Sequence, residues 1–286
     1  MVKIALIQLE SAGSKENNLA KHQEAIVKAS KQGAQIVCLQ ELFLTDYFCN
    51  EEKVEHFDLA EKIPGKSSDQ ISQLARANRI VLIASQFEKR GPGLFHNTTI
   101  VYNEEGNILG KYRKMHIPED PGFHEKFYFT EGDLGYVAIE TSYGKIGVLI
   151  CWDQWFPEAV RLTALQGAKI IFFPTAIGWL PEEKERLGFS QHNAWETVQK
   201  GHGVANGCFI AAVNRVGKEK GTQFWGQSFV SNPYGEIIAK ASPDNEEILI
   251  CEVDLKEIDD FRKIWPFYRD RRLDSYTKIT KRWIDA

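Results

Sequence analysis

The sequence predicts a layered α/β fold with mixed sheets, because three kinds of segment follow one another along the chain. Short apolar runs alternate with segments whose apolar residues recur at helical spacing. Hairpin signals lie between them. Such a mixture of β-α units and hairpins is typical of layered α/β folds. Hydrophobic residues make up 43% of the 286 residues, enough for a substantial core.

The β-α units follow from apolar runs and from residues that begin or end helices. Gly33 ends the first predicted helix, and Pro157 and Gly167 mark the two ends of the third, as helix boundaries favour. Turn residues inside apolar stretches predict hairpins at 101–109 and 229–238. The sequence thus predicts strands at 4–9, 36–39, 80–85, 146–150, 170–173 and 209–213, and helices at 17–32, 67–78, 157–166 and 191–205.

The chain shows no linker, low-complexity segment or short-period repeat, so we predict one domain over residues 1–286. Gln8 and Glu10 interrupt the first apolar run, which therefore indicates a strand rather than a signal peptide. No apolar run is long enough for a transmembrane helix. The net charge of −4 favours neither a nucleic-acid nor a membrane partner, and the cytoplasm is the expected location.

The C-terminal segment differs from the rest of the chain. Residues 262–286 carry eight basic and three acidic residues, interleaved with aromatic residues. A basic, aromatic tail can bind nucleic acid, but no nucleic-acid motif occurs elsewhere in the chain. We therefore predict an arm that docks on the body or on another subunit, with its aromatic side chains supplying buried area.

The five cysteines form no disulfide pattern, because their number is odd and no CxxC occurs. Cys38, Cys208 and Cys251 lie inside apolar runs, where a cysteine is usually a small core residue. Cys49 follows two aromatic residues in a predicted loop and is a candidate for a pocket wall. Cys151 differs from all of these, since a turn and a helix start follow it directly.

Three of the predicted strands are each followed by a side chain that can take part in catalysis. Glu41 follows the run at 36–39, Lys114 follows the second strand of the first hairpin, and Cys151 follows the run at 146–150. Functional groups gather at the carboxyl ends of strands in α/β sheets. A carboxylate can remove the proton of a thiol, and an ammonium stabilises a thiolate and an oxyanion. Singly, Glu41 and Lys114 are equally compatible with ordinary surface charges.

The segments around these residues resemble the glutamate, lysine and cysteine motifs of the nitrilase superfamily. They read LQELF at 39–43, YRKMHIP at 112–118 and LICWDQWFPE at 149–158. The resemblance covers essentially the whole chain, including NRVG at 214–217 and the aromatic tail. Within the superfamily the most similar branch is that of the N-carbamoylputrescine amidases, with support from EDPGFHEKFYF at 119–129 and QKGHGVANG at 199–207.

The resemblance implies a four-layer α-β-β-α sandwich that forms homo-oligomers built from dimers, with no metal and no cofactor. It implies a second glutamate at Glu125, which would position the substrate and hydrogen-bond with Lys114 or the attacking group. In the implied reaction Glu41 activates Cys151, and the thiolate attacks a carbamoyl or amide carbon of a small molecule. Lys114 and the backbone amide of Trp152 would then hold the oxyanion.

The sequence leaves two interpretations open for each candidate substrate-binding residue. Trp152 is compatible with a pocket wall and with core packing. Glu182 or Glu183, in a segment expected to lie over the site as a loop, could bind a far ammonium of the substrate, or could belong to a solvated helix turn. A substrate that carries a carboxylate would instead need an arginine or lysine in the pocket.

The sequence also leaves other functions open. Within the same superfamily they are an ω-amidase, a β-ureidopropionase and a nitrilase. A catalytically silent oligomeric scaffold would use the same fold, but the intact set of Glu41, Lys114 and Cys151 argues against it. A zinc hydrolase is disfavoured because none of the seven histidines has a recognised ligand spacing.

Overall fold

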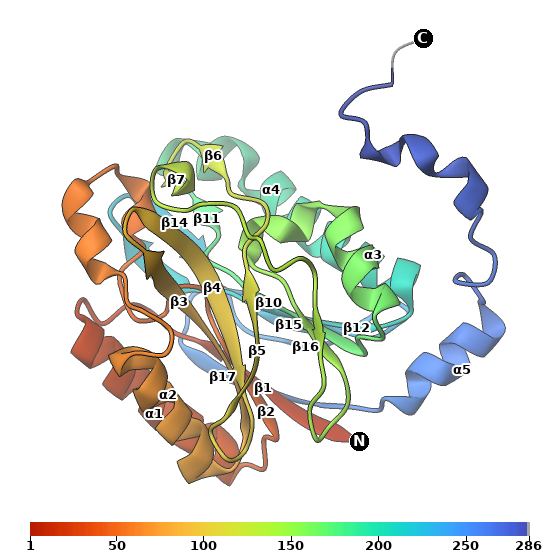
Figure 1. Cartoon of the computed structure of the whole chain (residues 1–286), viewed down its shortest axis with the longest axis horizontal. Coiled ribbons are helices and arrows are strands. Elements are labelled where there is room, and N and C mark those ends of the chain that lie inside the picture. The colour runs from red at the N-terminus through yellow and green to blue at the C-terminus, as the bar shows by residue number, and fades with distance from the viewer. Residues whose placement is uncertain (285–286) are drawn as a thin grey trace.

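The structure, a computed structural model, describes residues 1–284. Within that range the chain forms two six-stranded mixed sheets, with helices on the outer side of each sheet (Figure 1). Apolar clusters fill the space between the sheets and the space under each helical layer. The four-layer α-β-β-α sandwich predicted from the resemblance is therefore confirmed.

The first sheet has the strand order β17-β1-β2-β3-β4-β5. The neighbours β1, β2 and β3 are parallel, and the remaining pairs are antiparallel. The strands are β1 (Val2–Gln8), β2 (Ile36–Leu39), β3 (Val81–Gly91), β4 (Leu94–Tyr102), β5 (Ile108–Arg113) and β17 (Glu247–Val253).

The second sheet has the order β16-β15-β12-β10-β9-β8. Here β9, β10 and β12 are parallel, and the outer strands pair antiparallel. The strands are β8 (Ala138–Ile139), β9 (Ile146–Val148), β10 (Ile170–Pro174), β12 (Phe209–Val213), β15 (Phe229–Ser231) and β16 (Ile237–Lys240).

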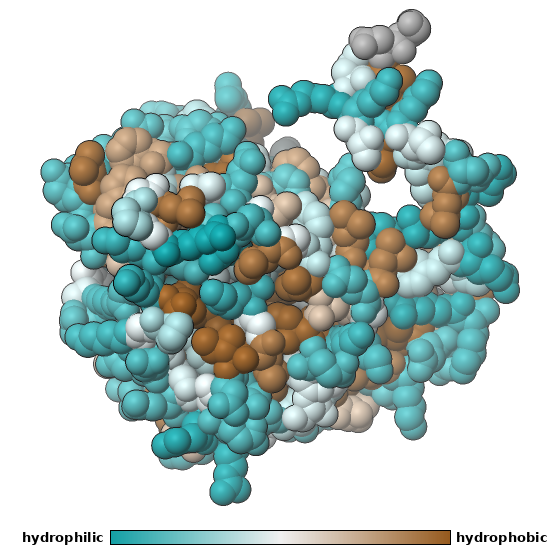
Figure 2. Space-filling view, in the orientation of Figure 1, coloured by the Kyte–Doolittle hydropathy of each residue, from teal (hydrophilic) through white to brown (hydrophobic). Residues whose placement is uncertain are grey.

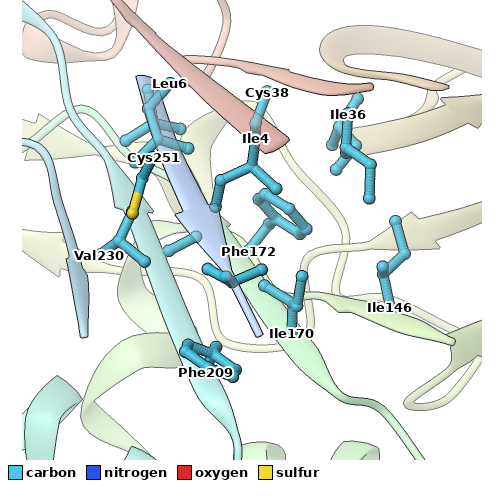
Figure 3. Packing of buried hydrophobic residues seen from close by; sticks show 14 of the residues in the cluster. Ile4, Leu6, Ile36, Cys38, Ile146, Ile170, Phe172, Phe209, Val230 and Cys251 are labelled. Atoms are coloured by element: carbon cyan, nitrogen blue, oxygen red, sulfur yellow. The ribbon is translucent and has the colours of Figure 1, made fainter. Parts of the chain in front are cut away.

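The central strands are apolar on both faces because both faces are covered, as parallel strands require. In β1, Ile4 and Leu6 face the space between the sheets, whereas Ala5 and Ile7 face the helices. Figure 3 shows Ile4 and Leu6 opposite Phe172 in the inner core. Cys38 and Cys251 lie in the same inner core, and Cys208 lies under the helices of the second sheet. These three thiols occupy the core positions expected of them.

Helices α1 (Lys15–Lys31) and α2 (Lys66–Asn78) cover the first sheet, and α3 (Pro157–Leu165) and α4 (Pro181–Asn206) cover the second. The Ser14 hydroxyl caps α1 by accepting a hydrogen bond from the Asn17 amide. Pro157 and Pro181 occupy the first turns of α3 and α4, where the missing N–H costs nothing.

Two predicted elements are longer than the sequence indicated. The helix predicted at 191–205 begins at Pro181, so residues 182–186 form the first turns of α4 rather than a loop. Their side chains are largely exposed, and an exposed helical turn carries no apolar periodicity. The strand predicted at 80–85 continues to Gly91, because it pairs with β4 along its length.

Small sheets stand at the end of the sandwich where β2, β5 and β9 terminate. β6 (Glu119–Asp120) and β7 (Phe123–His124) form a hairpin, and β11 (Gly178–Trp179) joins β14 (Thr222–Trp225) and β13 (Val216–Glu219). Figure 1 shows this hairpin beside α4. These elements border the pocket described below.

After α5 (Lys256–Ile264) the C-terminal arm contacts the body through Tyr268 and then extends away from it (Figure 1). Trp265, Phe267 and Tyr276 are more than a third exposed, and Trp283 is 79% exposed. Figure 2 shows hydrophobic and hydrophilic side chains side by side on this segment. The predicted arm runs to residue 286, and residues 285–286 lie outside the described part of the chain. No helix within residues 1–284 has the length and apolarity to cross a membrane.

Candidate active site

The ends of strands from both sheets meet at one buried site. Glu41 follows β2, and Lys114 follows β5 directly, both in the first sheet. Cys151 follows β9 of the second sheet. All three residues are buried, and Glu125, in the short 3-10 helix Glu125–Phe127 after β7, joins them. The four residues predicted to be catalytic therefore lie together.

The Lys114 ammonium lies between two carboxylates. Its Nζ donates to Glu41 Oε1 at 2.9 Å and to Glu125 Oε2 at 2.6 Å. Burial lowers the pKa of Lys114, but Glu125 and Glu41 outweigh burial, and its pKa lies well above the ordinary value. The group therefore stays charged and can stabilise negative charge on a reacting oxygen.

One oxygen of Glu41 is hydrogen-bonded and the other is not. Its Oε1 accepts hydrogen bonds from Lys114 and, at 2.7 Å, from Asn97 Nδ2. Its Oε2 is buried and accepts no hydrogen bond from any residue that the structure describes. A buried carboxylate oxygen with this freedom can take the proton of a neighbouring thiol.

Glu125 is held by two donors. Lys114 contacts Oε2, and the Tyr47 hydroxyl donates to Oε1 at 2.9 Å. Burial raises the pKa of Glu125 to about 7, against the opposing charge of Lys114. Glu125 lines the pocket beside Cys151, so it faces any bound substrate.

Cys151 begins the 3-10 turn Cys151–Trp155 in an unusual backbone conformation. Its φ of +38° lies in the left-handed region, which costs a residue with a side chain about 1–3 kcal/mol. Its Sγ–H donates to the Ala176 carbonyl at 3.9 Å. Burial raises the pKa of the Cys151 thiol well above its ordinary value, and Glu41 adds to this while Lys114 opposes it. The resting thiol is therefore neutral and needs a base.

A buried ion pair holds the loop that runs from Glu41 to Tyr47. The Arg215 guanidinium donates to the carbonyl oxygens of Glu41, Leu42 and Thr45 at 3.0–3.1 Å. It also pairs with Glu219 at 2.8 Å, and Glu219 accepts a hydrogen bond from the Tyr47 amide. One cation thus fixes the backbone that carries both Glu41 and the tyrosine bonded to Glu125.

Cys151 opens onto a cavity of about 270 Å³. Its walls are mostly apolar, and Phe123, Trp152, Trp155 and Trp225 supply the aromatic part. Trp152 thus takes the pocket-wall position rather than a core position. Such a cavity suits the apolar stem of a small substrate. Cys49 does not line it; this thiol is buried in an apolar cluster behind the site.

One part of the pocket wall is acidic. Asp120, from the β6–β7 hairpin, and Glu183, from the first turn of α4, both line the cavity. Asp120 Oδ1 is buried and accepts no hydrogen bond within residues 1–284. Burial, and then the nearby charge of Glu183, raise the pKa of Asp120 to about 6. Glu182 is exposed, and the structure does not bring it to the pocket.

Three side chains of the site escaped the sequence reasoning. Asn97, Tyr47 and Asp120 contact the catalytic groups or line the pocket, yet none ends a predicted strand run. Asp120 lies in the segment EDPGFHEKFYF, which supported the family resemblance, but no sequence pattern singled out its side chain. Glu41 and Asn97 are 56 positions apart in the chain, so no local pattern could reveal their contact.

A separate group of side chains could hold a metal ion. Ligand atoms of Glu52, Glu119 and His124 lie within 4.8 Å of one another, and His124 Nδ1 is 2.8 Å from Glu119 Oε1. Glu52 and Glu119 are exposed, and exposed acidic groups often gather without an ion. None of these three residues lines the pocket. The metal-free reaction implied by the resemblance remains a prediction.

This combination of sandwich and buried carboxylate, ammonium and thiol is that of a hydrolase of carbon–nitrogen bonds. The chain belongs to the carbon–nitrogen hydrolase family, whose model, "Carbon-nitrogen hydrolase", matches residues 3–263. The resemblance to the nitrilase superfamily is therefore confirmed. The protein is an enzyme, and a small-molecule amide is the class of substrate that fits this family.

Particular relatives are similar over nearly their full length. An N-carbamoylputrescine amidase of Solanum lycopersicum is 39% identical, over 96% of this chain and 94% of that protein. A citrullinase of Francisella tularensis subsp. tularensis is 37% identical, over 99% of both. A crystal structure of a carbon–nitrogen hydrolase from Helicobacter pylori G27 is 46% identical, with a TM-score of 0.96 over 99% of both chains.

Proposed function

We propose that the enzyme hydrolyses N-carbamoylputrescine to putrescine, carbon dioxide and ammonia. The acidic wall of the pocket is the observation that carries this proposal. The substrate has a terminal ureido group at one end and an ammonium at the other. With the ureido carbon at Cys151, the ammonium would reach Asp120 and Glu183. A charge-assisted hydrogen bond there is worth about 1.5–3 kcal/mol.

Citrulline is the second candidate substrate, because one similar relative is a citrullinase. Citrulline carries the same ureido group, and its far end has an α-carboxylate beside the ammonium. A carboxylate would call for a lysine or arginine in the wall. Among the residues that the structure describes, none of the pocket-lining side chains is a lysine or arginine. This composition favours a substrate whose far end is purely cationic.

The chemistry that we propose uses the geometry described above. Glu41 removes the proton of the neutral Cys151 thiol, and the sulfur attacks the ureido carbon. Lys114 and the Trp152 backbone amide stabilise the resulting oxyanion. Glu41 returns the proton to the leaving ammonia and then activates water, which releases the acyl group from sulfur as a carbamic acid. The C–N bond of this carbamic acid then breaks to give putrescine and carbon dioxide, and the thiol of Cys151 regains its proton. Glu125, held by Tyr47 and Lys114, orients the substrate amide.

The proposal is tested by ammonia release from N-carbamoylputrescine, N-carbamoylbutylamine and citrulline. N-carbamoylbutylamine lacks the terminal ammonium and is otherwise closely matched. We expect kcat/KM for N-carbamoylputrescine to exceed that for N-carbamoylbutylamine by about ten- to hundredfold, which corresponds to the contact energy above. Equal use of the two substrates would remove the diamine assignment, and a preference for citrulline would replace it.

Removing either acidic group should erase part of this preference. In Asp120→Asn and Glu183→Gln we expect kcat/KM to fall for N-carbamoylputrescine and to stay constant for N-carbamoylbutylamine. Glu182→Gln is the matched control, since Glu182 neighbours Glu183 but is exposed outside the pocket. Because Asp120 has a pKa of about 6, KM for the charged substrate should also rise as pH falls below that value. A pH-independent KM would argue against a contact with Asp120.

We further propose that the protein is a homo-oligomer in which the arm contacts a second copy. The segment 262–286 has a net charge of +5, and the remainder of the chain therefore carries −9 of the total of −4. Tyr268 packs on the body near Arg161, whereas aromatic residues farther along the arm stay exposed in a single chain. Opposite charges and exposed aromatic area suit the surface of a partner copy.

Deletion of residues 269–286 should reduce the size of the assembly. The deletion spares Tyr268 and α5, so the packing of the body is preserved. Light scattering on the truncated and full-length proteins measures the effect, and circular dichroism checks the fold. An unchanged assembly size in a folded truncation would refute the role of the arm.

A further inference from the structure

The Asp153 carboxylate lies two residues after the nucleophile and is fully buried. Its Oδ2 accepts hydrogen bonds from the Tyr112 hydroxyl at 2.8 Å and from the Ile150 amide at 2.9 Å. Its Oδ1 accepts from His116, through Nδ1 at 2.7 Å and through the backbone amide at 3.1 Å. All four donors are satisfied by one side chain.

These donors belong to two separate parts of the site. Tyr112 and His116 stand on either side of Lys114 in the chain, and Ile150 directly precedes Cys151. β5, which leads to Lys114, belongs to the first sheet, and β9, which leads to Cys151, belongs to the second. The Asp153 carboxylate therefore connects the two sheets where their catalytic residues emerge.

The connection is needed because both catalytic residues lie beyond the regular strands. β9 ends at Val148, and β5 ends at Arg113. One further backbone hydrogen bond to the neighbouring strand follows each end, from the Lys114 amide to the Asn97 carbonyl and from the Leu149 amide to the Phe172 carbonyl. Beyond Leu149, strand pairing no longer sets the position of the cysteine turn. The left-handed φ of Cys151 also requires a turn that its surroundings hold in place. Asp153 bonds to the Ile150 amide within this turn and to the lysine segment outside it.

The neighbours of Asp153 make this connection rigid. The His116 ring stacks on Phe156 with centroids 3.7 Å apart, so its Nδ1–H has a fixed direction. Tyr112 is fully buried in the second-sheet core cluster. Asp153, Tyr112 and Ile150 are buried, so bulk water cannot replace the hydrogen bonds among them without moving the chain. The His116 ring is a quarter exposed and is held in place by its stacking on Phe156.

We propose that Asp153 is a positioning residue that sets the placement of the Cys151 sulfur relative to the Lys114 ammonium. It contacts neither side chain and acts through the backbone on both sides. This inference rests on the catalytic roles proposed above for Cys151 and Lys114, and it is independent of which amide is the substrate. Loss of the carboxylate should therefore slow the chemical step more than it weakens substrate binding.

The test compares Asp153→Asn with two other variants. Asparagine keeps the size of the side chain but cannot accept from all four donors. Tyr112→Phe removes a single donor and is the milder variant. Asp133→Asn is the matched control: Asp133 bonds to Arg113, next to Lys114, but is half-exposed and does not touch the cysteine turn.

We expect kcat of Asp153→Asn to fall by about 100-fold with little change in KM, as a small misplacement of reacting groups produces. Tyr112→Phe should lose kcat to a smaller extent, and Asp133→Asn should stay within about twofold of wild type, as a surface ion pair predicts. The rate at which iodoacetamide alkylates Cys151, read by mass spectrometry of that peptide, should fall in the same order. If the role of Asp153 were purely structural, Asp153→Asn would lower the melting temperature, and kcat and the alkylation rate would stay unchanged per folded molecule.

The outcomes separate this inference from the substrate assignment. The alkylation rate needs no substrate, and kcat can be measured on whichever amide the wild type hydrolyses. Folded Asp153→Asn that keeps kcat and alkylation rate within about threefold of wild type would overturn the positioning role. If Asp153→Asn does not fold, Tyr112→Phe decides: an unchanged kcat and alkylation rate there would overturn it equally.

Discussion

Replacement of Cys151 by alanine is expected to abolish turnover and to leave the protein folded. The thiol is the one nucleophile beside the Glu41–Lys114–Glu125 cluster within residues 1–284 that also lines the pocket. Loss of a catalytic nucleophile reduces kcat by about 10⁶-fold in a well-characterised serine hydrolase. The fold should survive, because the change removes a single buried sulfur atom and the main apolar clusters remain.

The other cysteines provide matched controls for this result. Cys38→Ala and Cys208→Ala remove equally buried thiols from the inner core and from the core under α3 and α4. They should cost stability, on the order of 1 kcal/mol for a small core truncation, and keep activity per folded molecule. Ammonia release and urea unfolding measure the two effects. More than a few per cent of activity in Cys151→Ala would falsify the nucleophile assignment.

Replacement of Lys114 by methionine is expected to damage both stability and catalysis. The change leaves Glu41 and Glu125 buried without their shared cation. Removal of one partner from a buried ion pair costs about 3–5 kcal/mol. The reaction should also slow by about 10²–10³-fold, since the oxyanion loses a charged donor.

The loss of stability in Lys114→Met should depend on pH in a defined direction. The pKa of Glu125 is already raised to about 7, and Lys114 is the charge that opposes this rise. Without Lys114 the folded Glu125 carboxyl binds a proton that the unfolded chain releases, so stability falls as pH rises. Urea unfolding at about pH 6 and about pH 8 should therefore show the larger deficit at the higher pH.

Lys111→Met is the control for this variant, because Lys111 lies on the same strand and pairs with Glu88 at 3.4 Å in a partly exposed position. Its loss should cost about 0–1 kcal/mol, because Lys111 is partly exposed and the buried Glu88 keeps its ion pair with Arg113. If Lys114→Met were as stable and as active as Lys111→Met, the assignment of Lys114 to the reaction would have to be abandoned.

The candidate reacting groups could be selected from local sequence. Glu41, Lys114 and Cys151 each end an apolar run, and the carboxyl ends of strands are where α/β folds place functional groups. The motifs around them then indicated the family, and with it the sandwich and Glu125. Helix α4 shows the limit of this reasoning, since its exposed first turns carry no apolar period and were predicted as a loop.

The sequence by itself determined most of the long strands and helices, though not β17 or α5, and the three strand-end groups, because apolar periodicity reports backbone state and buried face. Only the tertiary structure decided how these groups meet. The enclosure of Lys114 by two carboxylates, the bond from Tyr47 to Glu125 and the link through Asp153 join residues 11 to 78 positions apart. The placement of Asp120 and Glu183 in one pocket wall likewise brings together residues far apart in the chain. Such contacts depend on how two sheets and their loops pack together, and periodicity along one segment carries no information about a partner in another.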